Sequence, residues 1–327
     1  MPVSLRRFVF AAASLFGVVH AGTAIADDQP KAPTIMAPTE VIYEHVVHSD
    51  LLGRDMRLLV WKPDHDAPKA GFPVIYSFDG ETSITAFAEF AAQAGVLGAR
   101  YKLSAPMIVA FAEMPGAHSN DQRMYDFTPF AETYELHERP NMLEWPKLGG
   151  GDIYLDAVMT EFKPFIAAQY AIDADRETLF GHSLGGMMVL HTLATRPDAF
   201  DAYVAVSPSL WFNRPQRFDE IKDLIANPDF APARPVPVMI TVGADESDLT
   251  AWDKMRLPSD HQERRLKWKK INAMVDNARA LAALIARDGS AKIDLDFSVL
   301  DRTNHHTAKP ITMYRAIEMA MTPRETP

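Results

Sequence analysis

The chain has 327 residues, 47% of them hydrophobic and 23% charged, which is the composition of a globular protein with a sizeable core. Its formal net charge of −10 argues against general binding to nucleic acid, because such binding needs a basic surface. The chain has no cysteine, so disulfides, thiolate metal sites, cysteine nucleophiles and lipidation at cysteine are excluded.

Residues 1–26 have the pattern of a secretory signal peptide. The basic pair Arg6 and Arg7 precedes an apolar run, and an Ala-Ile-Ala sequence at 24–26 gives the small-x-small pattern that signal peptidase recognises. A transmembrane anchor is the alternative, but polar residues and glycine interrupt the run. We expect cleavage and export to the periplasm or outside the cell, with no membrane anchor in the mature chain.

The segments after residue 26 predict a linker, a hairpin and then buried strands. A Pro-rich stretch at 27–40 is typical of an extended linker. Alternating apolar and polar residues at 41–49 and 55–63 predict an antiparallel hairpin. Continuous apolar runs at 72–80 and 105–113 predict strands covered on both faces, as in a parallel sheet.

Helical and strand patterns alternate along the rest of the chain. Further strands are expected at 176–180, 202–209, 236–243 and 292–300, and helices at 84–98, 152–170, 185–197, about 261–287 and 310–321. This alternation predicts a doubly wound α/β fold with a mostly parallel sheet and an antiparallel start. We expect residues 27–327 to form one domain, with a lid-like insertion at about 115–150.

The segment around Ser183 has the pattern of a nucleophile elbow. Gly181 and Gly185 flank the serine at the G-x-S-x-G spacing, with a strand before it and an apolar helix after it. The positive end of that helix would favour negative charge developing near the serine. Ser183 is therefore the candidate nucleophile, and the alternative is a glycine-rich turn that serves only packing.

An acid and a histidine follow in the order that such an elbow requires. Asp245 lies just beyond the strand at 236–243 and is the first choice of acid, with Glu246 as the alternative. His305 is favoured as the general base over His306, and both lie in the loop before the last helix.

Two backbone N–H groups are expected to form an oxyanion hole. One is that of Leu184, directly after the serine, and the other is that of Gly80 or Glu81, in the turn after an early strand.

Five segments give the chain a resemblance to a known family. They are YSFDGE at 76–81, RMYDFTP at 123–129, the helical stretch at 149–170, GHSLGG with SPSLWFN downstream, and NHHTAKP at 304–310. The chain resembles the putative-esterase branch of the α/β hydrolases, which includes enterochelin esterase and other ferri-siderophore hydrolases. The resemblance implies an α/β-hydrolase fold across most of the mature chain.

The resemblance also implies a function and further site residues. It implies a serine esterase that cleaves a catecholate siderophore trilactone, free or iron-loaded, with Ser183 as nucleophile and His305 as base. It suggests that Arg123 lies close to the pocket and that Trp211 lies near its wall. Iron would arrive within the substrate, so neither a protein metal site nor a cofactor is implied.

Some alternatives stay open at this point. The basic residues at 256–267 could face an anionic substrate, although a solvated helix face is the preferred interpretation. A general exported carboxylesterase for acyl, acetyl-sugar or cinnamoyl esters would need the same triad. A catalytically inactive ligand-binding protein is the less favoured hypothesis.

Overall fold

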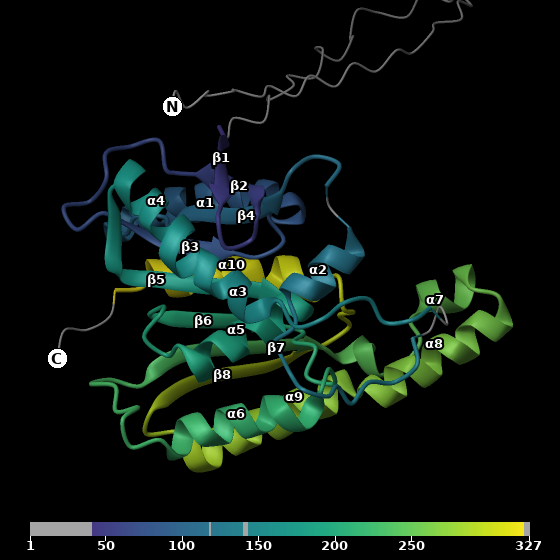
Figure 1. Ribbon diagram of the computed structural model, residues 1–327. Helices are drawn as coiled ribbons and strands as arrows, with labels where there is room; N and C mark the ends of the chain where they lie inside the picture. Colours follow the sequence, from purple (N-terminus) through teal and green to yellow (C-terminus); the bar gives the residue numbers. More distant parts are fainter. Residues whose placement is uncertain (1–40, 118, 140–142, 324–327) are drawn as a thin grey trace, which may run out of the picture.

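One mixed sheet forms the centre of the molecule (Figure 1). The computed structural model describes residues 41–117, 119–139 and 143–323, and within them the sheet has 8 strands in the order β1-β2-β4-β3-β5-β6-β7-β8. The strands are β1 (Tyr43–Ser49), β2 (Arg54–Trp61), β3 (Phe72–Ser77), β4 (Met107–Glu113), β5 (Ile172–His182), β6 (Ala202–Val206), β7 (Val236–Gly243) and β8 (Ile293–Leu300). The predicted signal peptide and linker lie outside the described residues.

The strand directions confirm the predicted antiparallel start. β1 pairs with β2 in an antiparallel hairpin in which Tyr43 lies opposite Val60, and β2 pairs antiparallel with β4. All pairs from β4 through β8 are parallel. The carboxyl ends of β3, β5, β6, β7 and β8 therefore meet along one edge, where open α/β sheets carry their sites.

Helices cover both faces of the sheet. Apolar residues of α1 (Ile84–Gly98) and α10 (Ala308–Met321) pack against one face. The other face is covered by α3 (Gly151–Ala157), α4 (Lys163–Gln169), α5 (Leu184–Thr195), α6 (Arg214–Ala226) and α9 (Met274–Leu284). Covering on both sides explains why β3, β4 and β6 are continuous apolar runs.

Short helical turns complete the architecture. They are η1 (Gly80–Thr82), η2 (Ala99–Tyr101), η3 (Val158–Phe162), η4 (Ala244–Ser247) and η5 (Ile285–Gly289), together with the short helices α2 (Asn120–Asp126) and α7 (Ala251–Arg256). No helix in the described ranges is long and apolar enough to cross a membrane.

The prediction of a single helix at about 261–287 is wrong. The chain forms two helices, α8 (Ser259–Asn272) and α9, separated by Ala273 in a left-handed conformation with φ 43°. The division follows from the environments of the two helices. Only Asn272 is buried on α8, whereas α9 buries seven of its residues, Met274, Val275, Asn277, Ala278, Leu281, Ala282 and Leu284. In Figure 1, α7 and α8 project away from the sheet.

The segment expected to form a lid contains α2 near its start and is largely irregular over the rest of its described part. Aromatic contacts hold it to the loop after β6. The ring of Trp145 lies 6.1 Å from that of Trp211, and Tyr134 lies 5.8 Å from Phe212, measured between ring centroids. A lid role for this segment stays a prediction.

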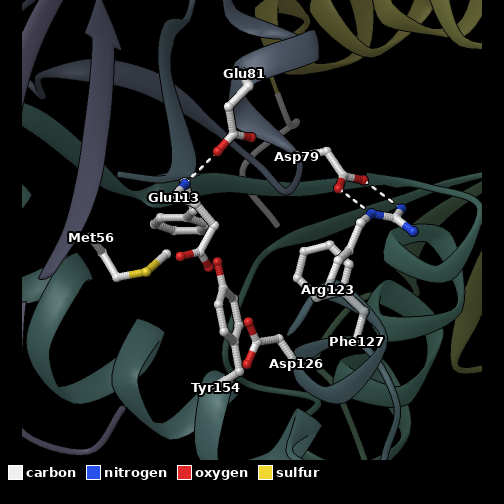
Figure 2. A pocket seen from close by; sticks show the side chains of 9 residues that line it. Met56, Asp79, Glu81, Glu113, Arg123, Asp126, Phe127 and Tyr154 are labelled. Atoms are coloured by element: carbon white, nitrogen blue, oxygen red, sulfur yellow. Dashed lines mark hydrogen bonds and ion pairs between the residues drawn. The ribbon is translucent and has the colours of Figure 1, made fainter. Parts of the chain in front are cut away.

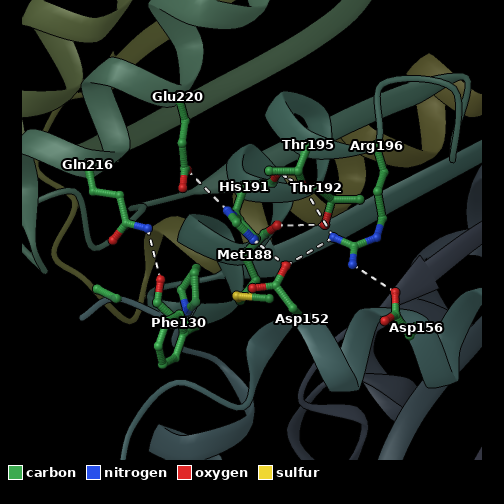
Figure 3. Close-up of polar contacts among 12 residues, drawn as sticks. Phe130, Asp152, Asp156, Met188, His191, Thr192, Thr195, Arg196, Gln216 and Glu220 are labelled. Atoms are coloured by element: carbon green, nitrogen blue, oxygen red, sulfur yellow. Dashed lines mark hydrogen bonds and ion pairs between the residues drawn. The ribbon is translucent and has the colours of Figure 1, made fainter.

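A charge network around one buried imidazole joins α3, α5 and α6 (Figure 3). His191 on α5 is 4% exposed, and its ring nitrogens lie 3.0 Å from Asp152 and 3.1 Å from Glu220. Burial lowers the pKa of His191, but the hydrogen bonds to Asp152 and Glu220 outweigh that effect, and the pKa is raised. The network therefore joins three helices through one buried imidazole, whose raised pKa favours the protonated form.

We expect His191→Gln to lower the free energy of unfolding by about 1–3 kcal/mol at pH 6, because the carboxylates of Asp152 and Glu220 lose the imidazole that bridges them. A histidine whose pKa is raised on folding contributes stability below its unfolded pKa and loses it as pH rises through the folded pKa. The difference in free energy of unfolding between the variant and the unmodified protein should therefore shrink from pH 6 to pH 9, as measured by urea titration. His261→Gln, on exposed α8, is the control, and a deficit independent of pH would contradict a charged His191.

Candidate active site

Ser183 lies on a sharp turn between β5 and α5. Its backbone has φ 62° and ψ −119°, a combination that residues with a side chain rarely adopt. Neighbouring backbone holds it: the Ser183 N–H donates to the Val206 carbonyl at 2.9 Å, and the Ser209 N–H donates to the Ser183 carbonyl at 3.1 Å. A Cβ atom on Gly181 would lie 2.2 Å from the carbonyl oxygen of Gly185, so only glycine fits there.

The turn brings Ser183 into line with His305 and a carboxylate. The Ser183 Oγ lies 3.0 Å from His305 Nε2, and His305 Nδ1 lies 2.6 Å from Glu246 Oε2. The three residues come from the ends of β5, β7 and the loop after β8. The Glu246 side chain is 3% exposed and that of His305 is 30% exposed, so the carboxylate is enclosed while the imidazole keeps access to solvent.

The expectation that Asp245 would meet the imidazole is wrong, and the alternative residue Glu246 holds that position. After β7 the chain turns through η4, and Glu246 folds back so that its Oε1 accepts from the Gly243 N–H at 2.8 Å. The same oxygen accepts from the Ser207 hydroxyl at 2.5 Å. This turn directs the second acidic residue after the strand, rather than the first, toward His305.

The surroundings of Glu246 keep it ionised. Burial raises the pKa of this carboxyl, but hydrogen bonds from His305, Ser207 and the Gly243 N–H outweigh burial and lower the pKa below its usual value. Ser207 lies in the SPSLWFN segment, yet nothing in the sequence indicated that its hydroxyl would donate to the acid. Its backbone has φ 43°, which shows that this position is also shaped by its surroundings.

Two other histidines flank His305. The Nε2 of His182 lies 2.7 Å from the His305 carbonyl oxygen, and the two rings lie 4.5 Å apart. Burial, followed by the charge of His305, lowers the pKa of His182 well below its usual value, so it is a neutral packing residue that supports the loop. His306 is exposed, and the imidazole at hydrogen-bond distance from Ser183 is that of His305.

The expected oxyanion donors lie on two adjacent segments. Leu184 begins α5, where the first N–H groups have no acceptor within the helix. Gly80 and Glu81 begin η1, directly after β3 and Asp79. The two segments touch, because a Cβ on Gly185 would lie 3.3 Å from that of Phe78. An oxyanion hole between them stays a prediction.

Arg123 and Trp211 differ in their surroundings. Arg123 on α2 forms a two-point ion pair with Asp79, at 2.5 Å from Nε to Oδ1 and 2.8 Å from Nη2 to Oδ2 (Figure 2). Trp211 lies in an aromatic cluster with Trp145 and Trp268, and the ring centroids of Trp211 and Trp268 are 5.2 Å apart. A substrate contact by either residue stays a prediction.

The segment that carries Trp211 also approaches the nucleophile. Ser209, which is 2% exposed, has its Oγ 3.4 Å from the Ser183 Oγ. The aromatic cluster therefore belongs to the same loop that contacts the candidate nucleophile.

A small pocket is lined by Asp79 and Arg123 together with carboxylate and aromatic side chains (Figure 2). Its lining includes Glu113, Asp126 and Tyr154, and Asp126 accepts from Arg54 at 2.5 Å. Burial raises the pKa of Asp126 to about 6, although Arg54 opposes that rise. Within the described part of the chain, no group of three or more His, Cys, Asp or Glu side chains is arranged to hold a metal ion.

The strand order and the strand–turn–helix unit at Ser183 define the α/β-hydrolase class. The chain belongs to the family described as Putative esterase, which matches residues 49–279. It is therefore a carboxylic ester hydrolase.

Known proteins of this kind resemble the chain over most of its length. It is 29% identical over 273 residues to the ferri-bacillibactin esterase of Bacillus subtilis, covering 83% of this chain and 86% of that protein. The solved BES protein of Bacillus cereus has 26% identity and a TM-score of 0.71, covering 93% of this chain and 100% of that one. A siderophore hydrolase of Aspergillus nidulans shares the fold at a TM-score of 0.74 and 22% identity, covering 92% of this chain and 98% of that one.

The geometry predicts different effects for the two acidic residues after β7. Glu246→Gln should lower kcat on p-nitrophenyl acetate by about 10²- to 10⁴-fold, because the imidazolium loses its charged partner. Asp245→Asn, next to it in the chain, is the matched control and should leave kcat close to that of the unmodified protein. An equal loss in both variants, with unchanged thermal unfolding, would contradict the assignment of Glu246.

Proposed function

We propose that this protein is an exported serine esterase that hydrolyses the ester bonds of a catecholate siderophore trilactone, free or iron-loaded, through an acyl-enzyme. The observation that carries the proposal is the continuous line from Ser183 Oγ through His305 to Glu246 in a chain of the esterase family. The siderophore is supported by the similarity to the ferri-bacillibactin esterase of Bacillus subtilis, and the catecholate trilactone by the resemblance to enterochelin esterases.

The geometry supports a two-step reaction. His305 Nε2, 3.0 Å from the Ser183 Oγ, accepts the hydroxyl proton as the oxygen attacks the ester carbonyl. The N–H groups of Leu184 and of Gly80 or Glu81 would donate to the oxyanion. The imidazolium, stabilised by Glu246, then protonates the leaving alcohol oxygen, and an acyl-enzyme forms.

The second step uses the same groups. A water molecule gives a proton to His305 and attacks the acyl carbonyl, and the proton then returns to the Ser183 oxygen as the acid product leaves. Each ester of a trilactone would pass through this cycle once, so the ring would open to a linear trimer and then shorten to dimer and monomer.

Two features beside the site suit an anionic aromatic substrate. The first is the aromatic cluster of Trp145, Trp211 and Trp268, whose flat rings can pack against catechol rings. The second is α8, which carries more basic than acidic residues in an acidic protein. Partial desolvation and the charges of His305 and of Arg265 on α8 lower the pKa of His306, so this helix acts electrostatically on the histidine loop.

The direct test is hydrolysis of ferric enterobactin by the mature protein, followed by chromatography, beside p-nitrophenyl acetate. We expect linear trimer, dimer and monomer to appear in sequence, and faster turnover of the siderophore than of the simple ester. Ser183→Ala and His305→Ala should each lower kcat by about three or more orders of magnitude. His306→Ala is the matched control and should retain turnover.

The outcomes separate the candidate functions. Cleavage of p-nitrophenyl acetate without cleavage of the siderophore would contradict the substrate and favour a general exported carboxylesterase. Binding of the siderophore without any Ser183-dependent turnover would contradict the enzyme itself and favour a ligand-binding protein.

The aromatic cluster gives a separate prediction about specificity. Trp211→Ala should raise KM for ferric enterobactin and change KM for p-nitrophenyl acetate little. The small ester has no catechol ring that would pack against Trp211. Trp252→Ala, which changes a 60% exposed tryptophan on α7, is the control. Equal effects on both substrates would show that Trp211 only supports packing.

A further inference from the structure

We propose that the ion pair between Arg123 and Asp79 positions the oxyanion hole and neutralises a carboxylate beside it. Arg123 then acts on the reaction through Asp79, as a positioning residue, rather than by binding the substrate. This inference rests on the proposed function, because it needs the turn after β3 to supply an oxyanion donor.

Asp79 is the residue that shapes this turn. It has φ 54° and ψ 53°, in the left-handed region that disfavours residues with a Cβ. Its carbonyl oxygen accepts from the Ser83 hydroxyl at 2.7 Å and from the Thr82 N–H at 3.2 Å. The conformation of Asp79 therefore sets the direction of the next two N–H groups, those of Gly80 and Glu81.

Arg123 fixes the Asp79 side chain in one orientation. The guanidinium donates from Nε and Nη2 to the two carboxylate oxygens, at 2.5 Å and 2.8 Å. Such a fork defines the plane of the carboxylate as well as its position, which a single hydrogen bond does not. The side chains are only 19% and 13% exposed, so water screens the pair little.

The carboxylate that Arg123 holds lies against the nucleophile elbow. A Cβ on Gly185 would lie 3.5 Å from Asp79 Oδ2, so this oxygen borders the first turn of α5, where Leu184 offers its N–H. The ion pair thus lies beside both segments that would form the oxyanion hole. An unpaired carboxylate there would oppose the negative charge of the tetrahedral intermediate, and the guanidinium offsets it.

Two further contacts hold the same turn from other elements. The Glu81 carboxylate accepts from the Glu113 N–H at the end of β4. Lys309 on α10 donates from Nζ to the Thr82 hydroxyl at 2.9 Å. These contacts fix the far end of the turn, and the Arg123–Asp79 pair holds the side chain at its start.

A substrate anchor and a positioning residue differ in what they do to a neutral ester. An arginine that only anchors an anionic siderophore contributes nothing to hydrolysis of p-nitrophenyl acetate, which has no charge to bind. A positioning arginine contributes to every substrate, and its loss lowers kcat rather than raising KM.

The experiment is a double-mutant cycle on p-nitrophenyl acetate with Arg123→Gln, Asp79→Asn and the double variant. Arg123→Gln should lower kcat by about 10- to 100-fold with KM nearly unchanged, because it removes the guanidinium that holds and offsets the Asp79 carboxylate beside the oxyanion. Asp79→Asn should lose less, since it leaves the cation of Arg123, rather than an anion, beside the oxyanion. The double variant should recover part of the loss of Arg123→Gln, and Arg123→Lys should fall between Arg123→Gln and the unmodified protein.

A second readout and a matched control keep the test independent of folding. Inhibition by phenylboronic acid, whose adduct with the serine carries the tetrahedral negative charge, should weaken in Arg123→Gln by the same factor as kcat. Arg54→Gln removes an arginine from a neighbouring ion pair with Asp126 and Glu113. It should match Arg123→Gln in thermal destabilisation without lowering kcat.

The results separate the two levels of the proposal. Normal kcat on the neutral ester in Arg123→Gln, with a raised KM for ferric enterobactin alone, would overturn the positioning role and favour a substrate anchor. Additive losses in the double variant would also overturn it. If Ser183→Ala keeps its activity, the proposed function itself fails, whatever the Arg123 variants do.

Discussion

The site depends on one close backbone approach at the turn between β5 and α5. The carbonyl of Gly185 lies where a side chain at Gly181 would be, and this compression holds Ser183 in its unusual backbone conformation. A hydroxyl raised in this way points out of the sheet edge instead of packing into the core. It is then within reach of groups that arrive from strands distant in the sequence, and the hydrogen bond with His305 spans 122 residues of chain.

Those groups are held by compensation of charge as much as by packing. Glu246 is almost fully buried, which alone would favour its neutral form, yet three donors keep it ionised. The charge of Asp79 is compensated in a similar way, because its carboxylate borders the elbow and forms an ion pair with Arg123. Both acids lie on turns that follow a strand, and in each case the partner comes from another element. The site at this edge of the sheet therefore forms only when the whole fold is assembled.

Much of this arrangement could be predicted from the sequence, for physical reasons that also explain the errors. Burial on both faces makes β3 and β4 continuous apolar runs, and the crowded turn at Ser183 requires glycine at fixed spacing, so both leave clear patterns. Asp245 and Glu246 follow the same strand, and only the η4 turn decides which carboxylate meets His305. The break between α8 and α9 falls at an alanine without a glycine or proline to mark it. The contact between Arg123 and Asp79 joins residues 44 positions apart, which no local pattern encodes.

The central claim is that His305 and Glu246 activate Ser183 as a nucleophile, and covalent labelling tests it most directly. The protein would be treated with a fluorophosphonate, digested, and analysed by mass spectrometry for the modified peptide. The account predicts a single phosphonyl group on Ser183, and labelling that becomes slow in His305→Ala and in Glu246→Gln but not in His306→Ala. Labelling at another residue, or a rate at Ser183 that is indifferent to His305, would contradict it.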